Sequence, residues 1–89
     1  MKLLLSKVAR DFLDTLSPKQ FRQVVTTVFR LLSEPYPHDS KQLRGYLYHR
    51  VDIGEYRVVY EGEGDDLRVV LIGKRNDDEV YRILKRTKG

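Results

Sequence analysis

Apolar residues recur at helical spacing in two consecutive stretches of the N-terminal half of the chain. Ser6 and Ser17 stand at their starts, each a residue type that caps helices, and Pro18 with Gln20 completes a second helix-start signal. The first stripe is Val8, Ala9, Phe12, Leu13 and Leu16. The second is Phe21, Val24, Val25, Val28, Leu31 and Leu32, and two prolines follow it. The pattern predicts a helical hairpin, preceded by a short strand over residues 2–5.

The following segments have the alternation and apolar content of strands. Residues 48–53 alternate so that His49 and Val51 share one face, and Arg50 lies on the other. A short turn leads into a second strand over 56–61. A polar, glycine-containing loop then precedes a nearly continuous apolar strand over 67–72.

A short helix is predicted at the C-terminal end. Asn76 and Glu79 form a capping box, and Asp77 and Asp78 suit the positive end of the helix dipole. Its apolar face consists of Val80, Ile83 and Leu84. The predicted order is β-α-α-β-β-β-α. The predicted fold class is α+β, with an antiparallel sheet packed on the helical hairpin and residues 1–89 forming one domain.

Composition narrows the partners and the chemistry. Lys and Arg total 17 against 13 Asp and Glu, for a net charge of +4. This excess favours anionic partners, nucleic acid first, although a mild positive charge also serves solubility. The absence of cysteine and the presence of two separated histidines argue against a metal site, and we expect no cofactor. The N-terminal apolar run is too short for a signal peptide or membrane span, so we expect a cytoplasmic protein.

Arg50 and Arg57 are set into adjacent predicted strands. A single strand arginine ordinarily faces solvent. Two of them on strands about 5 Å apart can converge on one anion, provided that the hairpin register places them on the same face. Arginine suits phosphate because its planar guanidinium donates two parallel hydrogen bonds and stays charged. The register is not readable from the sequence.

Three other positions carry candidate chemistry. Lys74 and Arg75 lie between the last strand and the last helix, where rigid elements hold a side chain from both sides. Tyr81 is displaced from the apolar stripe of that helix, and its ring can stack on a base or its phenol can move a proton. His49 is the one histidine in this neighbourhood, a residue type suited to proton transfer, but alternation places it on the face of Val51, against the helices.

Together these segments resemble the RelE/ParE superfamily of toxins from type II toxin–antitoxin systems. The resemblance rests on RVDIGEYRVVY, on VVLIGKRNDDEVY, and on LRG at residues 43–45, and it covers nearly the whole chain. RelE-type members cleave messenger RNA in the ribosomal A site, and ParE-type members act on DNA gyrase. The resemblance therefore implies a cognate antitoxin as partner in either case.

Three positions match the RelE-type nuclease pattern: Arg57, Arg75 and Tyr81. The resemblance implies that they are catalytic, and Arg50 partly meets its requirement for basic residues on the preceding strand. We expect Arg50, Lys74 and His49 to be RNA-binding residues. RelE-type nucleases carry lysines on the preceding strand, where this chain has His49 and Arg50, with Asp52 further along. The identity of the general base therefore stays open.

The implied reaction is metal-independent, because RNA supplies its own nucleophile in the 2′-hydroxyl. Arg57 and Arg75 would stabilise charge on the phosphate, and Tyr81 would stack on a base or transfer a proton. The alternatives are a ParE-like inhibitor of gyrase without enzymatic activity and a decayed toxin that binds its antitoxin alone.

Overall fold

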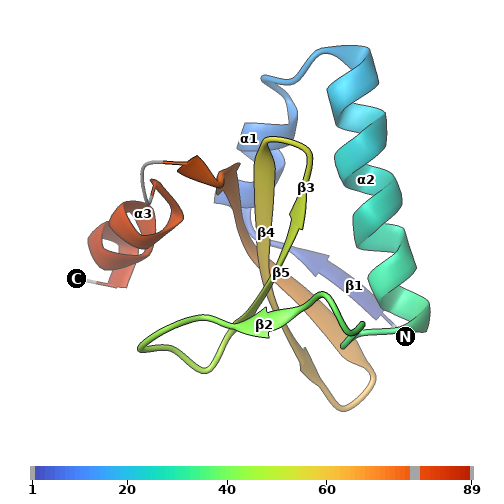
Figure 1. The fold of residues 1–89 in the computed structure, drawn as a ribbon, viewed down its shortest axis with the longest axis vertical. Helices are drawn as coiled ribbons and strands as arrows, with labels where there is room; N and C mark the ends of the chain where they lie inside the picture. Colours follow the sequence, from blue (N-terminus) through green and yellow to red (C-terminus); the bar gives the residue numbers. More distant parts are fainter. Residues whose placement is uncertain (1, 77–78, 89) are drawn as a thin grey trace.

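The computed structural model describes residues 2–76 and 79–88, and it consists of one sheet with helices on both faces (Figure 1). In chain order the elements are β1 (Lys2–Leu5), α1 (Lys7–Leu13), α2 (Pro18–Ser33), β2 (Lys41–Gln42), β3 (His49–Ile53), β4 (Tyr56–Glu63), β5 (Asp66–Lys74) and α3 (Glu79–Lys88). The predicted α+β class and the order of the predicted elements are confirmed. No helix in this described part of the chain is long and apolar enough to cross a membrane.

The sheet is mixed, which corrects the expectation of a wholly antiparallel one. Its strand order is β1-β5-β4-β3-β2, and β1 pairs with β5 in parallel, whereas the other pairs are antiparallel. The α1–α2 hairpin carries the chain across the sheet, and this connection sets the direction of β1. The sequence of a four-residue strand does not show whether it will pair in parallel or antiparallel. The two-residue β2 was not predicted, because a lysine and a glutamine show no strand pattern.

The two N-terminal helices begin where the serines predict. The Ser6 hydroxyl accepts from the backbone N–H of Ala9 at 3.0 Å and donates to the carbonyl of Val70 at 2.6 Å. The start of α1 is therefore fixed to β5. The contact lies at the irregularity where the pairing of β4 with β5 skips Val70. The Ser17 hydroxyl accepts from the N–H of Gln20 at 3.4 Å. Asp77 and Asp78, which were predicted to suit the positive end of the last helix dipole, lie outside the described residues.

Each face of the sheet has its own apolar core. The first core lies between the sheet and the α1–α2 hairpin, and the second lies beneath α3. The fully buried members of the first include Val24, Leu31, Val51, Val58, Tyr60 and Ile72. The buried members of the second are Leu43, Val59, Leu71, Val80 and Leu84. The α3 face has the smaller core, and this leaves room on it for polar side chains.

A pair of substitutions in α2 tests which of its faces carries stability. Leu31 is fully buried and Phe29 is 56% exposed. Leu31→Ala should lower the free energy of unfolding by about 2–5 kcal/mol, because it leaves a cavity in the first core. Phe29→Ala should stay within about 0.5 kcal/mol of the unsubstituted protein. Urea denaturation measures both, and equal losses would contradict the assignment of the buried face.

Candidate functional site

The register of the β3–β4 hairpin places two arginines and a carboxylate on one face of the sheet. Gly54, in the turn, has a φ of 58°, a conformation that glycine adopts without strain. In the resulting ladder Asp52 lies opposite Arg57, and Arg50 lies opposite Val59. Val59 belongs to the core beneath α3. Arg50, Asp52 and Arg57 therefore all face the α3 side, and the question that the sequence left open is answered.

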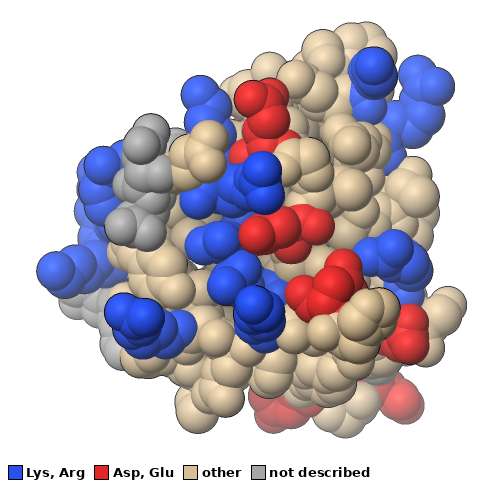
Figure 2. Space-filling view, viewed as in Figure 1, with Lys and Arg blue, Asp and Glu red and all other residues tan. Residues whose placement is uncertain are grey.

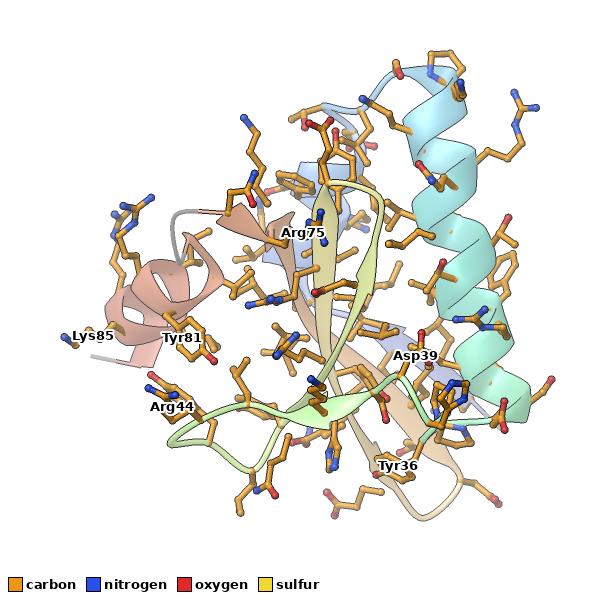
Figure 3. All side chains as sticks on the ribbon, in the orientation of Figure 1. Tyr36, Asp39, Arg44, Arg75, Tyr81 and Lys85 are labelled. Carbon is orange, nitrogen blue, oxygen red and sulfur yellow. The ribbon has the colours of Figure 1, made fainter. Side chains whose placement is uncertain are left out.

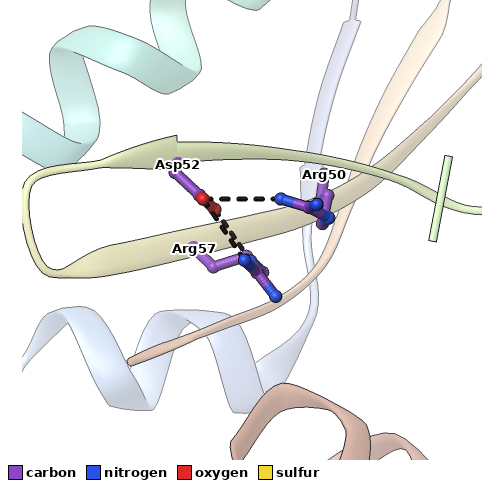
Figure 4. A network of polar contacts seen from close by, with 3 residues as sticks. All are labelled: Arg50, Asp52 and Arg57. Carbon is purple, nitrogen blue, oxygen red and sulfur yellow. Dashed lines mark hydrogen bonds and ion pairs between the residues drawn. The ribbon is translucent and has the colours of Figure 1, made fainter. Parts of the chain in front are cut away.

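Asp52 binds both arginines (Figure 4). Its Oδ1 accepts from Nε of Arg57 at 2.7 Å, and its Oδ2 accepts from Nη2 of Arg57 at 3.2 Å. The same Oδ2 accepts from Nη1 of Arg50 at 3.4 Å. The Arg57 side chain is 13% exposed. Because two hydrogen bonds hold its guanidinium, Arg57 is a preorganised and partly desolvated cation.

The charges around Asp52 govern its ionisation. Burial alone would raise the pKa of its carboxyl. The hydrogen bond from Arg57 and the positive charges of Arg57, Arg50 and Arg75 outweigh burial and hold that pKa below its ordinary value. Asp52 is therefore ionised at neutral pH, and it neutralises part of the positive charge of the site.

A cleft of about 460 Å³ opens beside this network, between the hairpin and α3. It is lined by Gln42, Arg44, Arg50, Arg57 and Tyr81. Tyr81 is half-buried against the core beneath α3, and Figure 3 shows it next to Arg44, which comes from the β2–β3 loop. Three of the six site residues predicted from the sequence thus meet in one cleft.

Arg75 lies at the border of this cleft. Its side chain is exposed, and its backbone N–H donates to the carbonyl of Glu55 at 3.0 Å, which fixes it next to the β3–β4 turn. Its charge contributes to the lowered pKa of Asp52. Arg75 therefore belongs to the same electrostatic environment as Arg50 and Arg57, although it does not line the cleft.

His49 and Lys74 lie on the opposite face, and the structure does not group them with the arginines. The ring of His49 is 4.7 Å from that of Tyr36 and 6.3 Å from that of Tyr60. Lys74 pairs with Tyr56, a buried residue of the first core. Alternation along a strand causes both placements. The sequence-based grouping of His49 and Lys74 in one RNA-binding site with Arg50 is thus not reproduced.

Two lining residues, Gln42 and Arg44, were missed from the sequence. Arg44 follows Leu43, which is buried beneath α3 and whose N–H donates to the carbonyl of Tyr48 at 2.8 Å. Gly45 has a φ of 80°, so the chain reverses directly after Arg44. The LRG segment at residues 43–45 does show an apolar residue, an arginine and a glycine that favours a turn. It does not show which part of the sheet the loop will face.

Basic side chains gather on this face of the molecule (Figure 2). They lie between α3 and the β3–β4 hairpin, with acidic side chains beside them. Four arginines surround the cleft, Arg44, Arg50, Arg57 and Arg75, against the carboxylate of Asp52. This arrangement gives an electropositive cleft with one aromatic wall, which suits a phosphate next to a base.

A larger hollow of about 860 Å³ adjoins the cleft on the other side of the β2–β3 loop. Its lining includes Leu43, Leu47, Tyr48 and Leu84, and it shares Gln42 and Arg44 with the cleft. Apolar side chains predominate there. It therefore suits an apolar segment better than a phosphate, and the smaller cleft is the candidate site for an anion.

The model of the ParE toxin of type II toxin–antitoxin systems matches residues 3–79. The chain therefore belongs to this toxin family, and the predicted RelE/ParE superfamily is confirmed. It is a toxin of a type II toxin–antitoxin system. Among curated proteins, none matches the chain significantly.

Several solved RelE toxins and toxin–antitoxin complexes share this fold. The RelBE2 toxin–antitoxin complex of Mycobacterium tuberculosis matches with 25% identity and a TM-score of 0.71, over 83% of this chain and 96% of that one. The archaeal RelE–RelB complex of Pyrococcus horikoshii matches with 21% identity and a TM-score of 0.75, over 85% of this chain and 96% of that one. The isolated E. coli RelE toxin matches with 24% identity and a TM-score of 0.73, over 97% of each chain. These structures confirm the fold.

The ion pairs of Asp52 predict how stability depends on pH. Because its pKa is lowered in the folded protein, Asp52 stabilises the fold above its unfolded pKa of about 3.9 and loses that contribution as pH falls through its folded pKa. Unfolding of the unsubstituted protein and of Asp52→Asn, compared between pH 3 and pH 7, should therefore show a stability difference that shrinks on acidification. A difference independent of pH would contradict these ion pairs.

Proposed function

We propose that this toxin is a ribosome-dependent endoribonuclease that cleaves messenger RNA by attack of the 2′-hydroxyl on the adjacent phosphate. The single observation that carries the proposal is the meeting of Arg50, Arg57 and Tyr81 in one cleft. These residues come from three different elements. The ribosome would present the RNA, since an open cleft with one aromatic wall gives limited affinity for a free strand.

The reaction needs a proton acceptor, stabilisation of negative charge on the phosphate oxygens, and a proton for the departing 5′-oxygen. Arg57 and Arg50 are the phosphate ligands in this proposal, and Arg75 adds positive charge from the border of the cleft. The low exposure of Arg57 supports its role, because a fixed and partly desolvated cation stabilises developing charge more than a solvated one does.

Tyr81 forms the aromatic wall of the cleft. It is half-buried, it packs against the core beneath α3, and it also lines the cleft. We assign it to stacking on a base next to the cleaved phosphate, and to giving a proton to the leaving oxygen. Base stacking on an aromatic ring contributes about 1–3 kcal/mol.

The partner that restrains the toxin is a cognate antitoxin in this proposal. The solved structures with this fold include toxin–antitoxin complexes, among them those from Mycobacterium tuberculosis and Pyrococcus horikoshii. The apolar hollow beside α3, with Arg44 in its lining, offers a surface for an amphipathic, acidic segment.

A second candidate function is inhibition of DNA gyrase without catalysis. The match to the ParE family favours it, and so does Asp52, which neutralises part of the charge that a nuclease would direct at phosphate. Arg44, Arg57 and Tyr81 would then be contact residues. The two functions differ in their target, so assays on ribosomes and on gyrase separate them.

The assay for the first function is a purified translation system with a defined messenger RNA. The toxin should cut the message when ribosomes are present and leave it intact when they are absent. Arg57→Ala and Arg75→Ala should each lower the cleavage rate about 10²–10³-fold, because each removes a cation that stabilises the transition state. Tyr81→Ala should also lower it, through lost stacking.

Arg22→Ala is the matched control, since Arg22 is exposed on α2 and the change removes the same charge. It should cleave at the unsubstituted rate, and all variants should remain folded at the assay temperature. Intact messenger RNA together with blocked supercoiling by gyrase would transfer the assignment to the second function. Loss of folding in the cleft variants would make their residues structural.

A further inference from the structure

The proposed nuclease lacks an assigned proton acceptor for the 2′-hydroxyl, and the structure narrows the choice. The side chains that line the cleft are one amide, three guanidinium groups and the phenol of Tyr81. A guanidinium stays protonated, and a free phenol has a pKa near 10. His49 is on the other face of the sheet, in contact with Tyr36 and Tyr60. Among the residues that the structure describes, Asp52 is a carboxylate that binds two of the lining arginines directly.

We propose that Asp52 is the proton acceptor of the reaction. This inference rests on the proposed nuclease function and adds a catalytic residue to it. The geometry that carries it is the pair of contacts from one carboxylate to Arg57 at 2.7 Å and to Arg50 at 3.4 Å (Figure 4). A phosphate held by these two guanidinium groups lies next to Asp52. The 2′-oxygen in a reactive arrangement lies about 3–3.5 Å from that phosphorus.

The same contacts explain how a carboxylate that pairs with arginines becomes a base. Phosphate and carboxylate compete for the same guanidinium donors, so a bound phosphate weakens the hold of Arg57 and Arg50 on Asp52. It also brings a negative charge beside Asp52. Both changes favour the protonated carboxyl, so Asp52 gains proton affinity when the substrate arrives.

The charged and titratable neighbours of Asp52 come from several elements. Arg50 is on its own strand, Arg57 is on β4, and Arg75 follows β5. Arg44, from the β2–β3 loop, and Tyr81, from α3, line the adjoining cleft. Three of these cations, Arg50, Arg57 and Arg75, oppose protonation of Asp52 in the free protein. The negative phosphate is the added charge that reverses this balance.

The step balances in atoms and protons. The 2′-oxygen forms a bond to phosphorus while its proton passes to Asp52, and the bond from phosphorus to the 5′-oxygen breaks. The departing 5′-oxygen takes a proton from the phenol of Tyr81, which regains one from water as Asp52 releases its own. The products are a 2′,3′-cyclic phosphate and a 5′-hydroxyl.

The experiment uses the full chain, ribosomes stalled on a defined messenger RNA, and single-turnover cleavage between pH 4.5 and pH 9. Asp52→Asn should lower the maximal rate about 10²–10⁴-fold and remove the acidic limb of the pH–rate profile. It should also lower the half-saturating toxin concentration, because it removes a negative charge beside the phosphate site. Slower chemistry with tighter binding is not expected of a residue that merely holds the arginines in place.

Asp39→Asn is the matched control, because Asp39 is an exposed aspartate whose ion pair with Arg30, at 3.9 Å, lies away from the cleft. It should leave the rate and its pH dependence unchanged. If Asp52→Asn does not fold, Asp52→Glu is the variant that tests the proposal. It should cleave at a reduced rate and keep the acidic limb of the pH–rate profile. An Asp52→Glu variant without that limb would overturn the proposal.

The outcomes separate this inference from the function on which it rests. If the unsubstituted toxin leaves ribosome-bound messenger RNA intact, the nuclease function fails and the role of Asp52 fails with it. If the unsubstituted toxin cleaves but Asp52→Asn cleaves as fast, or keeps its acidic limb, the nuclease function stands and Asp52 is not the proton acceptor.

Discussion

The pairing of Asp52 with Arg57 across the β3–β4 hairpin determines how the strand residues of the cleft are placed. A side chain in a strand changes face with every residue, so a shift of one position would send Arg57 into the core beneath the helical hairpin. The turn at Gly54 and the burial of Val51 and Val58 on the other face fix the register. The carboxylate then fixes the guanidinium. Fold and site are thus specified by the same hairpin.

The cleft is positively charged, and Asp52 neutralises part of that charge. The cations are Arg44, Arg50, Arg57 and Arg75. Asp52 binds Arg50 and Arg57, and the charge of Arg75 also lowers its pKa. Such a site does not bind anions as strongly as four unpaired cations would. It favours a ligand that carries a phosphate in one place and a base in another, because Tyr81 adds an aromatic surface at the side of the cleft.

The sequence predicted the helices, the three longer strands and the side of the sheet on which His49 lies, because capping residues and alternation are local signals. It did not predict that Arg50 and Arg57 share a face, since hairpin register depends on a turn whose conformation is set by packing. Lys74 and Arg75 are neighbours in the chain and were grouped together, but the last strand ends between them, so they have different surroundings. Arg44 was missed because a loop residue is placed by what its neighbour Leu43 buries.

We infer that the cleft between β3, β4 and α3 holds RNA through its arginines and Tyr81. The NMR spectrum of the toxin, titrated with a short RNA whose 2′-hydroxyls are methylated to prevent cleavage, reports this binding residue by residue. The Nε–H signals of Arg50, Arg57 and Arg75 and the ring signals of Tyr81 should shift together, whereas those of His49 and Tyr36 should not. Shifts confined to His49, Tyr36 and the surface of α2 would contradict it.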